Sequence, residues 1–236
     1  TTGAITLDDT NDAYSGSAAD LVSAFAGTVT THTGTVTITD APTVAQLKAI
    51  NAATTGAITL GTTNGALSGS AADLAAAFAG TVTEYTGNME INDVAGTAIQ
   101  AAYLASIGSA TTGTVTVANA VVITGNHQQL TAALVTADSR VFLGGSSNDA
   151  SVLLNDADGS SISATTLSNI GGQTNATVTV TNAVAITGTT AEVTAALVTA
   201  ATKVVVTDAF VTITSAMTVA EVNAIAASTT GVVTGT

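Results

Sequence analysis

The chain has 236 residues, of which 46% are hydrophobic and only 8% are charged, so it is too apolar for a disordered segment. Its formal net charge of −13 comes from 16 acidic and 3 basic residues. Such a surface repels phosphate backbones and anionic lipid, and we expect neither nucleic acid nor a membrane surface as a partner. The absence of cysteine excludes disulfide bridges and thiolate metal sites, and no apolar run approaches the roughly 18 residues that span a bilayer.

Internal repetition dominates the sequence. Residues 2–34 match residues 55–87 at about three positions in four, and residues 36–56 recur as 211–231. A third pair joins residues 114–125 to 177–188. The three families share one template with a step of about 27 residues, which is typical of stacked repeat proteins. The expected repeats span residues 1–27, 28–53, 54–80, 81–110, 111–137, 138–173, 174–200 and 201–228, and a ninth opens at 229–236.

Each repeat begins with a short alternating run such as "TGAITL" or "TGTVTV". In the first of these, Ile58 and Leu60 point to one side and Thr59 to the other, which predicts a half-buried strand. A second β-prone piece such as "AVVIT", "AVAIT" or "FVTIT" follows in most repeats. A segment of about ten residues with apolar side chains at helical spacing comes next.

A helix-capping signal precedes most of these helical segments. Ser70 is followed three residues later by Asp73, so the serine hydroxyl can accept a hydrogen bond from the backbone amide of Asp73. The same spacing recurs at one phase of seven repeats, which predicts a short capped helix in each. The pairs are Ser17 with Asp20, Thr43 with Gln46, Ser70 with Asp73, Thr97 with Gln100, Asn126 with Gln129, Thr189 with Glu192 and Thr218 with Glu221.

A single repeat cannot fold alone, because its few large apolar side chains contribute about 1.5–3 kcal/mol each, whereas ordering its backbone costs on the order of 40 kcal/mol. Stacking must supply the remaining stabilisation. We therefore predict an α/β solenoid of right-handed coils, each with one or two short parallel strands and one short capped helix. Helices need more space than strands, so the coils should form a gently curved or twisted rod.

The sixth repeat, residues 138–173, is about nine residues longer than the others and carries Asp149, Asp156 and Asp158 among Gly and Ser. Calcium favours carboxylate and carbonyl oxygens in flexible loops, so these residues are the candidate metal ligands. The alternative, which the sequence favours, is a solvated insertion rich in turn-forming residues. The acidic run "LDDTND" at residues 7–12 permits the same two interpretations, and a plain acidic turn is favoured there.

Catalytic chemistry has little support in the sequence, and we predict that the chain is not an enzyme and requires no cofactor. His32 and His127 lie in different repeats, and His32 aligns with Tyr85, which predicts a tolerant surface position. No nucleophile elbow, zinc motif or phosphate-binding loop is present.

Threonines occupy the outward position of several expected strands. Thr6, Thr59, Thr116 and Thr179 would form ladders when the repeats stack, and flat Thr arrays resemble those of ice-binding solenoids. The alternative is that Thr is simply a favoured β residue. Glu90 and Val205 interrupt the array, which favours the second interpretation.

The segments "TVAQLKAINAATTGAITL" and "NAVAITGTTAEVTAALVTA" resemble the Ala, Thr, Gly and Val-rich repeat arrays of giant secreted bacterial cell-surface proteins, including cyanobacterial ones. The resemblance implies a structural extracellular protein of a surface layer, sheath or filament that self-associates end to end or side by side. The alternative is an adhesin stalk or calcium-dependent adhesive module, with cell-surface polysaccharide as a partner. The final "TTGVVTGT" looks like the opening of another repeat, so we expect the chain to be part of a longer protein.

Overall fold

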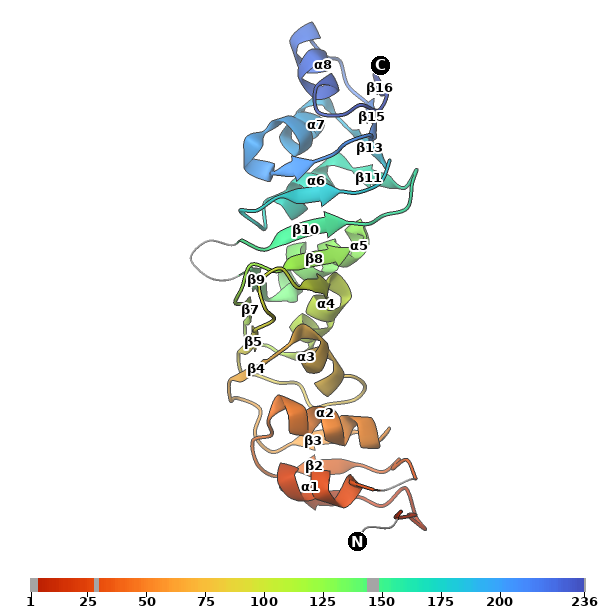
Figure 1. Cartoon of the computed structure of the whole chain (residues 1–236), viewed down its shortest axis with the longest axis vertical. Helices are drawn as coiled ribbons and strands as arrows, with labels where there is room; N and C mark the ends of the chain where they lie inside the picture. Colours follow the sequence, from red (N-terminus) through yellow and green to blue (C-terminus); the bar gives the residue numbers. More distant parts are fainter. Residues whose placement is uncertain (1–3, 28–29, 144–148, 236) are drawn as a thin grey trace. The chain divides into compact units, whose positions relative to one another are not determined.

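The computed structural model describes residues 4–27, 30–143 and 149–235, and for Ala200 it describes the backbone alone. Its residues group into two compact units, Thr1–Asn92 with Ser106–Thr116, and Asp93–Ala105 with Val117–Thr236. The described residues form eight α-helices and four β-sheets, and every recorded strand pair is parallel (Figure 1). The chain is therefore a parallel α/β protein.

In the N-terminal unit, strands β1 (Tyr14–Gly16), β2 (Val36–Ile38) and β3 (Ile58–Leu60) form one sheet in that order. Strands β4 (Leu67–Gly69), β5 (Met89–Ile91) and β7 (Val115–Val117) follow one another in a second sheet. The helices α1 (Ala18–Phe25), α2 (Val44–Ala53) and α3 (Ala71–Ala77) pack in sequence, α1 on α2 and α2 on α3. Figure 1 shows α1 and α2 beside strands β1 to β3.

In the C-terminal unit, one sheet has the order β14-β12-β10-β8-β6 and another the order β11-β13-β15-β16. Helix α4 (Ala101–Ala110) follows β6, and its residues from Ser106 on are grouped with the N-terminal unit. Strand β9 (Val141–Leu143) precedes the residues that the structure leaves undescribed. The sheet strands are β6 (Ala98–Gln100), β8 (Val122–Gly125), β10 (Ser151–Leu154), β12 (Val178–Val180), β14 (Val204–Val205), β11 (Ser161–Ser163), β13 (Ala185–Gly188), β15 (Phe210–Ile213) and β16 (Val233–Gly235). The helices are α5 (His127–Leu130), α6 (Ala164–Gly171), α7 (Thr190–Val193) and α8 (Val219–Ala226).

Paired strands come from successive repeats of the sequence. Tyr14 pairs with Val36, and Val36 in turn pairs with Ile58, so each partner lies one repeat further along the chain. The interval along the chain is longer where Val122 pairs with Ser151. The repeats thus pair in order, although the interval between partners is not constant and some repeats contain one strand whereas others contain two.

The apolar core follows the alternation predicted for the strands. Ile58 and Leu60 are buried, whereas Thr59 between them is exposed. On the helices, Leu47 and Ile50 of α2 are completely buried. The inward faces of most strands and one stripe of the helices thus form the core, as their periodicity predicts, whereas β1, β14 and β16 have no buried residue.

Most of the predicted helix caps are confirmed. The hydroxyl or amide oxygens of Ser17, Thr43, Ser70, Asn126, Thr189 and Thr218 accept hydrogen bonds from the predicted backbone amides. The prediction for Thr97 is wrong, because Ala98–Gln100 forms strand β6 and α4 begins only at Ala101. Ser163, which we did not single out, caps α6 through the amide of Thr166.

Buried threonines tie each turn to the repeat before it. Thr54, Thr111, Thr174 and Thr229 are at most 9% exposed. Each hydroxyl donates to a backbone carbonyl of the preceding repeat and accepts from the amide two residues later. One buried side chain thereby satisfies two backbone groups, which removes the cost of burying them unpaired.

Glycine two residues after three of these threonines, Thr54, Thr111 and Thr229, permits close contact between backbones, whereas Ala176 stands at this position after Thr174. A Cβ atom at Gly56 would overlap the carbonyl oxygen of Gly34, and one at Gly231 would overlap that of Ala209. The same overlap would occur at Gly113 against Gly87. The "TTG" turns therefore need glycine for space between neighbouring repeats.

Candidate functional site

The long repeat holds the acidic residues with the strongest sequence signal, and Asp156 is the one that the structure buries. It is 6% exposed and follows strand β10. One carboxylate oxygen accepts the backbone N–H of His127 at 2.8 Å, and the other lies 2.6 Å from Nδ1 of the same histidine. Asp156 thus supplies a carboxylate to the positive N-terminus of α5 in the preceding repeat.

This capping from the next repeat is a recurring feature. The carboxylate of Asp40 accepts the N–H of Ala18 at 2.7 Å, and the hydroxyl of Ser215 accepts that of Thr190 at 2.9 Å. In each case the donor is the first residue of a helix, and the acceptor belongs to the following repeat. Asp156 therefore has a role in the stacking of repeats.

The other two candidate metal ligands lie apart from this carboxylate pair. Asp158 accepts the backbone N–H of Ala183 at 3.0 Å, and Asp149 is exposed just before β10. Among the residues that the structure describes, no three His, Asp or Glu side chains are grouped so that they could hold a metal ion. The structure does not bring the three aspartates into one group, and the calcium site at Asp149, Asp156 and Asp158 stays a prediction.

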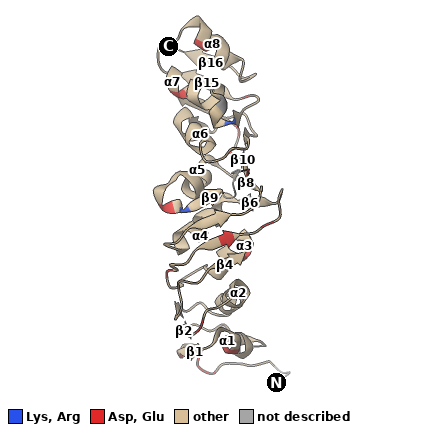
Figure 2. Ribbon diagram, turned by 90° about the vertical axis from the view of Figure 1, so that its left-hand side faces the viewer, with Lys and Arg blue, Asp and Glu red and all other residues tan. Residues whose placement is uncertain are grey.

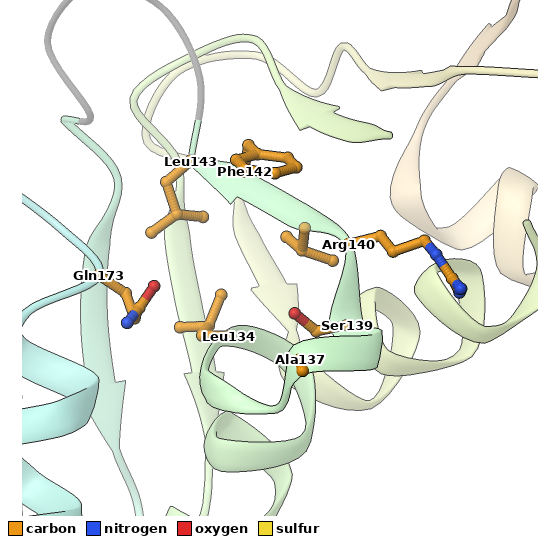
Figure 3. Close-up of a pocket in the computed structure, with 8 residues that line it drawn as sticks. Leu134, Ala137, Ser139, Arg140, Phe142, Leu143 and Gln173 are labelled. Atoms are coloured by element: carbon orange, nitrogen blue, oxygen red, sulfur yellow. The ribbon is translucent and has the colours of Figure 1, made fainter. Parts of the chain in front are cut away.

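A pocket lies beside β9 and the end of the helical segment before it (Figure 3). Its volume is about 250 Å³, which is below the usual range of ligand pockets, about 300–1,000 Å³. Leu134 and Leu143 face this space, Gln173 lies at its edge, and the Arg140 side chain extends away from it (Figure 3). The pocket is a small hollow whose lining is mostly apolar and also includes Ser139, Arg140 and Gln173.

His32 is not at the surface, and the prediction of a tolerant exposed position is wrong. Its side chain is completely buried, and its ring is stacked on that of Tyr14 at a centroid distance of 4.6 Å. The two ring nitrogens contact the Thr54 hydroxyl at 3.1 Å and the Asp12 carbonyl oxygen at 2.8 Å. His32 is therefore an internal polar link between repeats.

Tyr85, the counterpart of His32, is also buried, with 2% of its surface exposed. Its ring packs edge-on against Phe78 at 5.6 Å. Burial raises the pKa of the Tyr85 phenol, and a hydrogen bond with the Gly65 backbone opposes this change. The equivalent positions 32 and 85 can thus hold a histidine or a tyrosine, because each of these side chains combines an apolar ring with polar atoms that bond to neighbouring repeats.

The predicted threonine ladder is interrupted. Thr37 and Thr59 are in register on β2 and β3, but Thr179 lies between Leu153 and Val205. A different hydroxyl row runs across β11, β13, β15 and β16, and our sequence reasoning missed it. It consists of Ser163, Thr187, Thr212 and Thr234.

The three cationic side chains occupy structural positions, and Figure 2 shows how sparse charged residues are along the ribbon. Lys48 of α2 forms an ion pair with Asp73 of α3. The hydrogen bond from Lys48, with a second from Ser70, lowers the pKa of Asp73.

Arg140 and Lys203 have positive φ angles of 50° and 55° at the ends of two equivalent helical segments. Glycine is the usual residue in this conformation, so the sequence alone did not indicate it.

The described helices include none that is both long and apolar enough to cross a membrane. No protein-family model, curated protein or solved structure matches the chain.

Proposed function

We propose that the chain is a structural element of a bacterial extracellular surface layer, sheath or filament, built as an α/β solenoid of right-handed coils. The observation that carries this proposal is the use of polar side chains to join successive repeats. Thr54, Thr111, Thr174 and Thr229 all donate to the backbone of the preceding repeat. Asp40, Asp156 and Ser215 cap helices of the preceding repeat in the same way.

The strand pairing supports the same proposal. Each recorded pair joins segments of two successive repeats in parallel, as neighbouring coils of a solenoid do. Extracellular location follows from the resemblance to secreted repeat arrays. Self-association into a filament or lattice is the mode of action expected of such a scaffold.

Small-angle X-ray scattering on the whole chain tests the solenoid architecture. A solenoid gives a maximum dimension several times its cross-section, with a cross-sectional radius that does not change when the concentration is lowered. A globular scattering profile would contradict it.

Thermal unfolding in calcium and in chelator separates the scaffold from a calcium-dependent adhesive module. The scaffold requires no metal, so the midpoint should be the same in both buffers. If calcium raises the midpoint and Asp149→Asn or Asp158→Asn abolishes this rise, the result would favour the adhesive module instead.

A further inference from the structure

Strands β4, β5 and β7 lie side by side in the N-terminal unit (Figure 1), and a polar hollow lies on their outward face. Its volume is about 300 Å³, at the lower end of the usual range of ligand pockets. No Lys, Arg or His is among its described lining residues, so the hollow offers no cationic group to an anionic ligand. The outward residues that line it are Ala66, Ser68, Asn88, Glu90, Thr114 and Thr116.

Glu90 is the lining residue that the fold does not explain. It stands exposed in the middle of β5, between the buried Met89 and Ile91, although glutamate is depleted in strands. Glu192 and Glu221 bind within capping boxes. In the described part of the chain, the Glu90 carboxylate has no hydrogen bond or ion pair of this kind, so its oxygens are open to a ligand.

The sheet of β1, β2 and β3 presents the same face without these polar groups. Strands β1 and β2 are the counterparts of β4 and β5 in the first copy of the repeat. Thr37 stands in the place of Glu90, and each is paired with a serine of the preceding strand. Thr35 stands in the place of Asn88. Both sheets form the same parallel strands, so folding requires neither the amide nor the carboxylate.

The neighbouring strands place a hydroxyl on each side of Glu90. Ser68 of β4 is in register with it. The bond from the Met89 N–H to the Thr114 carbonyl, 2.8 Å long, places Thr116 of β7 on the other side of the carboxylate. The carboxylate is therefore the centre of a polar row that crosses three strands.

Asn88 and Ser68 are held so that their donors stay available. The side-chain oxygen of Asn88 accepts the Thr114 N–H at 3.0 Å, so the NH2 group at the other end of the amide keeps its hydrogens for a ligand. The Ser68 oxygen accepts a hydrogen bond from the Asn92 amide at 3.1 Å, so the serine can donate its own hydrogen. Two donors thus lie beside the acceptor Glu90. This mixture fits a ligand whose groups both donate and accept, as sugar hydroxyls do.

The hollow continues toward the helices. Ser68 also lines a second hollow, of about 570 Å³, whose two charged residues, Lys48 and Asp73, pair with each other. A sugar ring has a polar rim and an apolar face, so the next unit of a chain that occupies the first hollow can lie on the apolar lining of the second. This shared boundary favours a polymer over a free monosaccharide. The apolar lining consists of Val44, Ala45, Ala49, Ala52 and Gly69.

We propose that the hollow over β4, β5 and β7 binds a sugar unit of an uncharged polysaccharide. Glu90 accepts hydrogen bonds from the sugar hydroxyls, and Asn88 and Ser68 donate to them. This inference rests on the proposed function, because an extracellular scaffold is exposed to such polymers, and it adds to the scaffold a surface that retains them.

Affinity electrophoresis of the whole chain tests the proposal. Native gels are cast with dextran, laminarin, mannan or galactan as uncharged probes, and with dextran sulfate as the anionic probe. At least one uncharged polysaccharide should retard the chain, and dextran sulfate should not. Retardation by dextran sulfate, or by none of the probes, would overturn the proposal.

Calorimetry with an oligosaccharide of the retarding polymer assigns the binding to the hollow. Glu90→Gln should weaken binding about tenfold, because hydrogen bonds to a charged acceptor are replaced by bonds to a neutral amide. Asn88→Thr combined with Glu90→Thr should abolish binding. Since Thr35 and Thr37 hold these positions in the first sheet, the double variant should keep its thermal midpoint.

Glu84→Gln is the matched control, because it removes an exposed carboxylate of the same unit that lies outside the hollow. Its affinity should equal that of the natural chain. Unchanged affinity in the double variant, or an equal loss in Glu84→Gln, would overturn the assignment.

A transplant into the first sheet gives a gain of binding. Thr35→Asn, Thr37→Glu and Ala57→Thr together supply the polar groups of the second sheet, since the Ala57 carbonyl accepts the Val36 N–H as that of Thr114 accepts the Met89 N–H. The triple variant should bind two oligosaccharides per chain instead of one. The same variant without Thr37→Glu should bind one. A single site in the triple variant would contradict the assignment of these groups as the binding set.

A chelator separates direct binding from binding through a metal ion. The affinity should be the same in calcium and in EDTA, and binding that EDTA abolishes would overturn the direct contact. If the chain scatters X-rays as a rod and no polysaccharide binds, the solenoid scaffold survives and only this site fails. Binding by a chain with a globular profile would keep the site and reject the solenoid.

Discussion

Residues 36–56 and 211–231 share two thirds of their residues but lie in two different surroundings. Val44 is 7% exposed and its counterpart Val219 is 78% exposed, although both are valines at the first position of a helix. Leu47 is fully buried and its counterpart Val222 only partly so. The buried Ile50 and Ile225 show that the side facing the rest of the repeat is the same in both.

The difference lies on one side only, the side on which the next repeat would lie. Toward the preceding repeat, the hydroxyls of Thr54 and Thr229 donate to corresponding carbonyls, and Thr54 also bonds to the His32 ring. Gly56 and Gly231 make the same close backbone contacts. Local sequence therefore determines the elements of a repeat, and the presence of a neighbour determines which of its side chains are buried. Substitutions at paired positions separate these two contributions.

Glycine substitutions should have the largest effect and should act equally in both repeats. Gly56→Ala and Gly231→Ala each place a methyl group on a carbonyl oxygen of the preceding repeat, so each should lower the free energy of unfolding by about 3 kcal/mol in urea denaturation. Gly172→Ala is the control. Its nearest atom would be 3.5 Å away, and the change should be near zero or slightly stabilising. A small effect at Gly56 would show that the backbones can separate without cost.

Valine truncation should act in one repeat and not in the other. Val44→Ala removes two buried methyl groups and should lower the free energy of unfolding by about 2 kcal/mol. Val219→Ala, measured on the monomer, should change it by less than about 0.5 kcal/mol because the side chain is already in water. Equal losses at the two positions would mean that α8 is covered in the monomer.

Removal of a buried hydroxyl should again act on both repeats. Thr54→Val and Thr229→Val keep the shape of the side chain but remove the acceptor of the Gly56 and Gly231 amides and the hydroxyl donor to the preceding repeat. We expect each to lower the free energy of unfolding by about 1–2 kcal/mol in urea denaturation. Thr55→Val, at an adjacent and more exposed threonine, should have a much smaller effect.

The strands, helices and caps could be predicted because their signals are local. Alternation at Ile58 and Leu60 and the spacing of Ser70 and Asp73 depend on a few consecutive residues. Thr97 has the same cap spacing, yet Ala98–Gln100 pairs with β8 in the next repeat, and this pairing overrides the local signal. The prediction failed where a neighbouring repeat competed for the same backbone.

The site residues were harder to predict, because their surroundings come from other repeats. His32 is buried by Tyr14 and Phe25 and bonds to Thr54, and all three lie in other parts of the sequence. Asp156 has the composition of a calcium loop residue, but its carboxylate faces the start of α5 in the preceding repeat. Their acidic or imidazole chemistry is visible in the sequence, whereas the groups they face depend on the register between repeats.

The smallest expected effect distinguishes the two capping boxes by pH. The capping box of α2 pairs Thr43 with Gln46, whereas the equivalent box of α8 pairs Thr218 with Glu221. The hydrogen bonds from the Thr218 backbone and hydroxyl lower the pKa of Glu221 below its usual 4.5, and those from Thr189, with one from Thr165, do the same for Glu192. A lowered pKa in the folded state means that these glutamates stabilise the fold above about pH 4.5 and lose this contribution as the pH falls through their folded pKa values.

The double variant Glu192→Gln with Glu221→Gln should keep both boxes, as Gln46 does in α2, and should flatten the decline of the free energy of unfolding between pH 6 and pH 3. Urea denaturation across this range measures the slope, and Gln46→Glu should steepen it. Glu192 also accepts a hydrogen bond from Thr165 of the preceding repeat. The described side-chain hydrogen bonds of Gln46 and Glu221 lie within their own boxes, so single substitutions at these two positions isolate the capping group from the contacts between repeats. A slope unchanged by all three substitutions would assign the acid sensitivity to the carboxylates that join repeats, such as Asp40 and Asp156.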